Sequence, residues 1–188
     1  VHMLPVVLDV SVLKLCVVGS GPQAQRRLQM LDEAGAQFVR VYCNEAVAEM
    51  DDIAGDRIVH RLPTREEIAD CHVMYVANLS DMDGERLTAE GREVKTLVNV
   101  EDVRPLCDFH VPAMVRRGDL LLGVSTGGKS PGLARKLKEE LEKAFPEEWA
   151  GRLQKLSDQR DQWKSQGLGF SELIERTKVF IEKERWFS

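Results

Sequence analysis

Small residues follow an apolar segment near the start of the chain, at a spacing that could hold phosphate. Gly19, Gly21 and Ala24 form the pattern GxGxxA. The first glycine permits a tight turn, the second lets a ligand approach the backbone, and the small third residue lets a helix pack against a strand. Free N–H groups at the start of a helix attract phosphate. The pattern predicts a dinucleotide site formed by Gly19, Ser20, Gly21, Pro22, Gln23 and Ala24.

The segments around this turn have the composition that such a site needs. Short apolar runs rich in valine indicate buried strands, and apolar residues at helical spacing indicate helices between them. The predicted strands lie at residues 13–18, 38–42, 58–62, 73–77 and 96–100. The predicted helices lie at residues 24–34, 65–70 and 83–91. This alternation predicts an α/β fold with a Rossmann-like, doubly wound parallel sheet.

Polar residues after the second predicted strand bear on the kind of dinucleotide. An acidic residue that contacts the ribose is expected at this position. Glu45 is available there, and Asn44 could contact the ribose instead. Arg40 lies within the strand, and no arginine follows closely enough to hold a 2′-phosphate. These residues favour NAD over NADP as the cofactor.

The pattern changes in the last third of the chain. Extended segments at residues 109–115 and 120–125 precede a helix that Ser130 caps, that Pro131 opens and that Pro146 ends. This predicts a small α+β segment. The polar remainder predicts two or three helices, broken near residues 167–169, with Trp149, Trp163 and Trp186 interpreted as core residues of this tail rather than as a surface for a flat ligand.

Composition limits the class of protein. The formal net charge of -5 argues against a general nucleic-acid binder, although residues 116–138 are basic enough to attract a small polyanion. No apolar run is long enough to span a membrane, and residues 4–12 lack the features of a signal peptide, so we expect a cytoplasmic protein. Val1 and His2 are interpreted as additions ahead of a start at Met3. The four cysteines form no CxxC or CxxH pair, so no metal ligands are predicted.

Several motifs together resemble the N-terminal module of the siroheme synthase family. The most specific of them is VSTGGKSP at residues 124–131. The other similar segments are MLPVVLD at 3–9, VVGSGP at 17–22, EAGA at 33–36, NVED at 99–102, CDFHVPA at 107–113, RG at 117–118 and LAR at 133–135. The similarity covers residues 3 to 146 in register and fades over the C-terminal helices.

The resemblance implies the activity of precorrin-2 dehydrogenase/sirohydrochlorin ferrochelatase. In this family NAD oxidises precorrin-2 to sirohydrochlorin, and some members then insert ferrous iron to give siroheme. The implied architecture is a homodimer with an NAD-binding Rossmann domain at 3–112, a dimerisation segment at 113–146 and a C-terminal helical domain at 147–188. The methyltransferase domain fused to some members has no counterpart here, so the stand-alone form is expected. The eight carboxylates of the tetrapyrrole would suit the basic residues between 116 and 138.

The resemblance also implies roles for particular residues. Asp102 stands at the acidic catalytic position of the family, where a carboxylate could accept the proton released on oxidation or those released on metal insertion. Thr126 stands where the family has Ser or Thr near the tetrapyrrole, and its hydroxyl could hold a substrate carboxylate. The implied substrate-binding residues are Arg117, Thr126, Gly127, Gly128, Lys129 and Ser130.

One segment departs from the family pattern. After the fourth strand the family has Ala-Thr-Asp-Asp, whereas this chain has Ala77-Asn78-Leu79-Ser80-Asp81, and Gly84 stands where an asparagine is expected. Asn78 is still expected to contact the dinucleotide. The departure leaves two alternatives open. The chain could be a chelatase that inserts ferrous or cobaltous ions without oxidising its substrate, or a non-catalytic module that binds tetrapyrrole or NAD.

Overall fold

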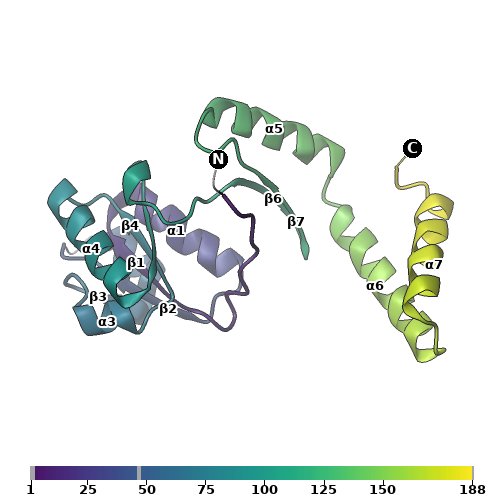
Figure 1. The fold of residues 1–188 in the computed structure, drawn as a ribbon, viewed down its shortest axis with the longest axis horizontal. Helices are drawn as coiled ribbons and strands as arrows, with labels where there is room; N and C mark the ends of the chain where they lie inside the picture. Colours follow the sequence, from purple (N-terminus) through teal and green to yellow (C-terminus); the bar gives the residue numbers. More distant parts are fainter. Residues whose placement is uncertain (1–2, 46–47, 188) are drawn as a thin grey trace. The chain divides into compact units, whose positions relative to one another are not determined.

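The computed structural model describes residues 3–45 and 48–187. Val1 and His2, interpreted above as additions, lie outside the described residues. The chain forms two compact units, Val1–Val111 and Pro112–Ser188. The first unit contains a five-stranded sheet with its helices, and the second contains a two-stranded sheet and three helices (Figure 1).

The first unit is a parallel sheet with the strand order β3-β2-β1-β4-β5. Its strands are β1 (Lys14–Gly19), β2 (Phe38–Tyr42), β3 (Ile58–Val59), β4 (Val73–Ala77) and β5 (Leu97–Val100). Its helices are α1 (Gly21–Glu33), α2 (Ala48–Ala54), α3 (Arg65–Ala69) and α4 (Asp81–Val94), with the 3-10 turns η1 (Gly55–Arg57) and η2 (Arg104–Leu106). The predicted doubly wound α/β fold is confirmed.

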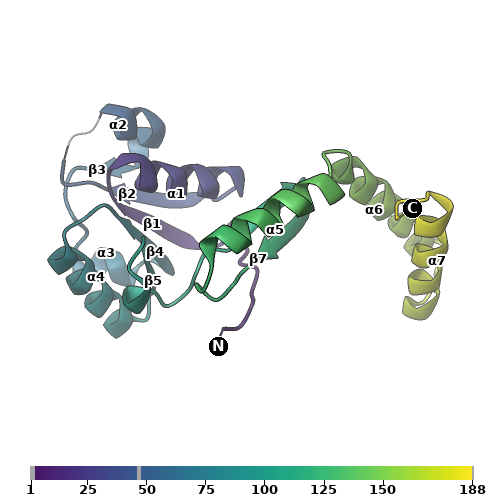
Figure 2. The same ribbon diagram turned by 90° about the horizontal axis from the view of Figure 1, so that it is seen from above.

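Helices cover both faces of this sheet. Figure 2 shows α1 and α2 on one side and α3 and α4 on the other. One core contains Leu15, Val17 and residues of α1 and α2, and the other contains Cys16, Val18 and residues of α3 and α4. Because alternate residues of β1 enter opposite cores, the strand is apolar throughout. That continuous apolar run is the reason its sequence predicted a buried strand.

The third strand is shorter than its sequence predicted. The prediction covered residues 58–62, but β3 ends at Val59. The N–H of Arg61 donates to the carbonyl of Val59 at 2.9 Å, so the chain bends away from the sheet at once. Helix α2 was not predicted, because only Met50 and Ala54 of its seven residues are buried.

The second unit begins with an antiparallel hairpin of β6 (Ala113–Arg117) and β7 (Leu120–Val124). Helices α5 (Pro131–Ala144), α6 (Trp149–Ser165) and α7 (Phe170–Lys183) follow. The side chain of Ser130 accepts a hydrogen bond from the N–H of Leu133 at 3.2 Å, and Pro131 stands in the first turn of α5. Both expectations for the start of this helix are confirmed.

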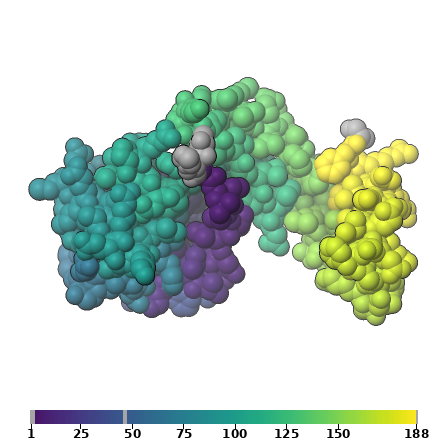
Figure 3. Space-filling model, in the orientation of Figure 1, coloured from purple at the N-terminus to yellow at the C-terminus, as the bar shows by residue number. Residues whose placement is uncertain are grey.

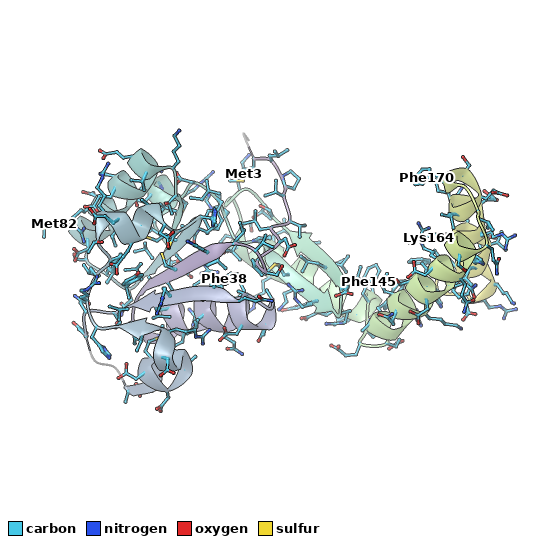
Figure 4. The ribbon with its side chains drawn as sticks, turned by 90° about the horizontal axis from the view of Figure 1, so that it is seen from below. Met3, Phe38, Met82, Phe145, Lys164 and Phe170 are labelled. Atoms are coloured by element: carbon cyan, nitrogen blue, oxygen red, sulfur yellow. The ribbon has the colours of Figure 1, made fainter. Side chains whose placement is uncertain are left out.

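Aromatic side chains join the last two helices. Trp149 and Trp163 are buried, each with 8% of its surface exposed. The ring of Trp163 contacts Phe180 of α7, and the ring of Trp149 contacts Trp186. The expected core role is thus confirmed for Trp149 and Trp163. Phe170, at the start of α7, points to solvent (Figure 4).

The segment before β1 runs along the surface of the molecule, where it is purple in Figure 3. Leu4 and Val7 are more than four-fifths exposed, whereas Val10 and Leu13 pack against the α1 side of the first unit. Across residues 3–45 and 48–187, none of the helices combines the length and the apolar composition needed to cross a bilayer. The same residues contain no cluster of His, Cys, Asp and Glu side chains suited to a metal ion.

Candidate functional site

The carboxyl ends of β1, β4 and β5 lie next to one another in the sheet. Gly19 at the end of β1 is paired with Ala77 at the end of β4, and Val76 is paired with Val100 at the end of β5. Ligands of doubly wound sheets bind outside this edge. The residues that follow the three strands therefore form the candidate site.

Gly19 occupies a position that only glycine can fill. Its φ is +120°, and a Cβ placed on it would lie 1.8 Å from the carbonyl oxygen of Ala77. The side chain is excluded by the backbone of the neighbouring strand. The absent Cβ lets β1 turn into α1 directly beside β4.

The first turn of α1 is open to an anion. Ser20 precedes the helix in an extended conformation without a side-chain cap, and the first turn contains no acidic residue. The helix is 13 residues long, so its aligned peptide dipoles favour negative charge at this end. Gly21 has a φ of +74°, and Ala24 is buried in the core below. A diphosphate fits these residues.

Asn78 lies beside the glycine turn. Its φ is +55°, and its Nδ2 would be 3.2 Å from a Cβ built on Gly21. A cavity of about 340 Å³ adjoins it, with Val76, Ser80, Gly84, Val100, Glu101 and Leu106 among its lining residues. Because Gly84 has no side chain, the asparagine expected there would narrow this cavity.

Asp102 stands on a tight turn after β5. The N–H of Val103 donates to the carbonyl of Val100 at 3.3 Å, which closes the turn, and Asp102 has a φ of +61°. Its side chain is exposed. The structure gives its carboxylate no hydrogen bond or ion pair with any residue in the ranges 3–45 and 48–187. A carboxylate in this setting can accept a proton.

An ion pair next to Asp102 was missed from the sequence. Arg27 of α1 donates from Nε to Oε2 of Glu101 at 3.0 Å and also from Nη2 to the same oxygen. The guanidinium lies 6.0 Å from the centre of the Tyr75 ring, and burial raises the pKa of Tyr75. Arg27 and Glu101 are 74 positions apart, so no local motif could have revealed the pair.

The expected ribose contacts follow β2. Asn44 and Glu45 form an exposed bend, held by Cys43, whose N–H donates to the carbonyl of Val59 at 3.0 Å and whose thiol lies 2.8 Å from the carbonyl of Glu45. Both residues therefore lie beyond the carboxyl edge of the sheet, and their contact with a ribose stays a prediction.

The predicted substrate residues belong to the second unit. Thr126 donates its hydroxyl proton to the carbonyl of Ser130 at 3.0 Å and accepts from the N–H of Ser130 at 3.2 Å. Gly127 and Gly128 both have positive φ, at +62° and +74°, and Lys129 is exposed. The Thr126 hydroxyl thus closes the loop, which exposes the backbone of Gly128 and the side chain of Lys129.

Arg117 is engaged within the second unit. Its Nε donates to the carbonyl of Phe145 at 2.8 Å, and its Nη1 is 3.0 Å from a carboxylate oxygen of Glu147. Only 12% of its side chain is exposed. These contacts connect β6 to the end of α5 and leave little of the guanidinium accessible to a ligand.

A family model described as "Putative NAD(P)-binding" matches residues 6–113, which is more than half of the chain. The chain belongs to this NAD(P)-binding family. The matched residues include the glycine turn, Asn78 and Asp102, and a nicotinamide dinucleotide is the cofactor of the family. A second model, described as "Sirohaem biosynthesis protein central", matches residues 117–144.

Curated relatives of this NAD(P)-binding chain are siroheme synthases. Siroheme synthase 1 of Yersinia enterocolitica is 29% identical, with 96% of this chain and 42% of the relative covered. The siroheme synthase of Nitrosococcus oceani is 33% identical, with 80% of this chain and 32% of the relative covered. The chain therefore spans less than half the length of these relatives.

A solved structure named "SirC, precorrin-2 dehydrogenase" has the same fold. It superposes with a TM-score of 0.78 at 24% identity and covers 99% of this chain and 93% of its own. The resemblance to the siroheme synthase family stated from the sequence is confirmed by these matches.

Proposed function

We propose that the chain oxidises precorrin-2 to sirohydrochlorin with NAD as the hydride acceptor. The observation that carries the proposal is the exposed Asp102 carboxylate, held at the carboxyl edge of an NAD(P)-binding sheet two strands away from the glycine turn. The relatives support it, because they are siroheme synthases and a precorrin-2 dehydrogenase by name.

The oxidation removes two hydrogens from the macrocycle, one as hydride and one as a proton. Bound NAD supplies the acceptor for the hydride. Asp102 takes the proton, because its carboxylate is exposed and can pass the proton on to solvent. The open first turn of α1 and the backbone at Gly21 would hold the diphosphate of NAD. Asn78, beside that turn, would contact the bound dinucleotide.

The bend after β2 favours NAD. In our proposal Glu45 or Asn44 binds the ribose hydroxyls, and the carboxylate of Glu45 repels the 2′-phosphate of NADP. Titration calorimetry with each cofactor tests this. We expect weaker binding of NADP by about tenfold or more, which corresponds to roughly 1.4 kcal/mol. Equal affinity for both would contradict this assignment.

The second unit is proposed to bind the carboxylates of the tetrapyrrole. Lys129 supplies a charge, and the N–H group of Gly128 supplies a donor, whereas the N–H of buried Gly127 already donates to the hydroxyl of Ser125 at 3.2 Å. Ser130 and Thr126 fix the shape of the loop through the hydrogen bonds described above. Arg117 contributes its charge and packing rather than a direct contact, because its donors are engaged.

The second unit also supports a homodimer. Helix α5 contains no buried residue, and Leu133 and Leu137 on its apolar stripe are 52% and 43% exposed. Exposed apolar side chains gathered on one face of a helix are typical of an interaction surface. A second copy of the chain would cover these residues. Light scattering coupled to size-exclusion chromatography should give twice the mass of the chain, and a monomer at micromolar concentration would refute the proposal.

The activity is tested with purified chain, precorrin-2 and NAD, followed by the absorbance of NADH and of sirohydrochlorin. Replacing Asp102 by Asn should lower kcat by about 100-fold or more, the usual contribution of a general base. Asp56→Asn is the matched control, since Asp56 is exposed in η1 at the opposite edge of the sheet. Full activity of Asp102→Asn would remove this residue from the mechanism.

Parallel reactions separate the alternatives. Sirohydrochlorin supplied with ferrous or cobaltous ions, without NAD, tests metal insertion alone. Metal insertion without any oxidation of precorrin-2 would identify a chelatase. Tight binding of sirohydrochlorin with neither reaction would identify a non-catalytic module, and either result would overturn the proposed oxidation.

A further inference from the structure

One ion pair of the first unit is more enclosed than the others. The side chains of Arg27 and Glu101 are each 20% exposed. Every other ion pair within residues 3–45 and 48–187 has at least one partner that is more exposed than this. The Tyr75 ring, which is itself buried and edge-on to Phe109, lies against the guanidinium. The pair is therefore held in a fixed geometry.

The pair fixes the residue that precedes Asp102. The backbone N–H of Glu101 donates to the carbonyl of Val76 at 2.8 Å, and its carboxylate is held by Arg27. Glu101, anchored at both backbone and side chain, and Asp102 are the two central residues of the turn from Val100 to Val103. Asp102 has a φ of +61°, a conformation that costs an L residue about 1 kcal/mol.

The pair also gives two neighbouring carboxylates different electrostatic surroundings. Glu101 is neutralised by Arg27, whereas Asp102 has no such cation among the described residues. Without Arg27, Glu101 would be a half-buried carboxylate without a partner, which is costly. It would turn to solvent, release the backbone of the turn and place a second negative charge near Asp102.

The cation comes from the helix that begins at the dinucleotide site. Arg27 lies six residues after Gly21 on α1, which is about 9 Å along a helix. The same rigid element thus presents its first turn to the diphosphate and its Arg27 side chain to the turn after β5. This arrangement sets the position of Asp102 relative to the bound cofactor.

We infer that Arg27 and Glu101 are positioning residues, which hold Asp102 in the left-handed conformation from which it serves as the base. The inference rests on the proposed oxidation of precorrin-2 for its kinetic consequence. It assigns neither residue a contact with the substrate. Its structural consequence, a rigid turn at residues 100–103, holds independently of any reaction.

The test compares two arginine variants, each of which removes an ion pair that involves a residue of α1. Arg27→Met keeps the apolar length of the side chain over Tyr75 but removes the charge. Arg57→Met is the matched control, because Arg57 pairs with Asp32 at the other end of α1. We expect kcat to fall about 10- to 100-fold in Arg27→Met, while KM for NAD stays within about twofold. The control should keep kcat within about twofold of the wild type.

A second variant and a second measurement complete the design. Arg27→Lys should recover part of kcat, since it restores the cation without its two-point contact. Amide hydrogen exchange of the peptide covering 97–108 should become about tenfold faster in Arg27→Met and remain unchanged in Arg57→Met. Unchanged exchange there, or equally faster exchange throughout the first unit, would overturn the inference.

The kinetic measurement and the exchange measurement test different claims, so the proposed function and the positioning role can be refuted independently. If the wild type does not oxidise precorrin-2, the proposed function is wrong, and the exchange of residues 97–108 still decides whether the pair holds the turn. If the wild type is active and Arg27→Met retains its full kcat, the positioning role is refuted, while the proposed function stands.

Discussion

Replacing Gly21 by alanine should weaken dinucleotide binding without unfolding the first unit. Gly21 has a φ of +74°, which costs an alanine about 1 kcal/mol. The added Cβ would lie 3.2 Å from Nδ2 of Asn78. Because that atom ends an exposed side chain, it can move by the few tenths of an ångström required. We therefore expect a loss of about 1 to 2 kcal/mol in the free energy of unfolding.

The effect on binding should be larger than the effect on folding. The methyl group would prevent the close approach between the backbone at Gly21 and the diphosphate. A hydrogen bond from an N–H group to a charged acceptor contributes about 1.5 to 3 kcal/mol. Losing one such bond raises the Kd for NAD by about 10- to 150-fold.

Gly35→Ala provides the matched control. Gly35 has a φ of +78°, and a Cβ there would contact nothing within 4 Å. Gly35 lies just beyond the far end of α1. An alanine there introduces similar backbone strain at a position that the proposed ligand does not contact. Titration calorimetry gives the Kd and urea denaturation gives the stability of all three proteins. Wild-type affinity in Gly21→Ala, or the same loss in Gly35→Ala, would show that the diphosphate does not lie at the glycine turn.

Four further predictions concern stability. Gly19→Ala should cost about 3 kcal/mol or more in urea denaturation, since its Cβ would lie 1.8 Å from a backbone oxygen of β4. Within α4, Gly91→Ala should destabilise by about 1 to 3 kcal/mol because its Cβ would lie 2.6 Å from a buried valine methyl group, whereas Gly84→Ala, with contacts of 3.8 Å, should stabilise by about 0.5 to 1 kcal/mol. The side chain of Arg61 and the N–H of Thr64 lower the pKa of Glu67 from 4.5 to about 2. This carboxylate therefore stabilises the fold by about 1 kcal/mol above pH 4.5, and the difference between wild type and Glu67→Gln should shrink steadily as the pH falls from 4.5 through about 2. A difference between these two proteins that stays constant over that pH range would contradict the assigned cause.

The fold was predictable where the periodicity of the sequence is strong. The predicted bounds 38–42 and 73–77 are those of β2 and β4, because both strands are covered by helices and contain few polar residues. Strand β3 was overestimated, since an apolar composition does not reveal the bend after Val59. Helix α2 was missed because it buries only two side chains.

Some features of the site could likewise be predicted from neighbouring residues, whereas others depend on residues far apart in the sequence. The glycine turn is a local pattern, because the sterics of a strand that turns into a helix determine which residues fit. The Arg27–Glu101 pair joins residues 74 positions apart, and it exists only because β5 lies beside β4 under α1. The engagement of Arg117 by the carbonyl of Phe145 also depends on tertiary packing. Motifs alone could not distinguish an accessible guanidinium from an occupied one.

Backbone strain marks the edge of the sheet that the proposed function uses. Four residues other than glycine have a positive φ within the described ranges, namely Asn78, Lys95, Asp102 and Arg185. Lys95 and Arg185 lie at the ends of helices, where this conformation is common. Asn78 and Asp102 instead follow the adjacent strands β4 and β5. Glycine would relieve the strain at both positions but would remove the amide and the carboxylate. Asn and Asp are the residue types that adopt this conformation at least cost while keeping a polar side chain, so both turns place a reactive or binding group where the cofactor and the macrocycle are proposed to meet.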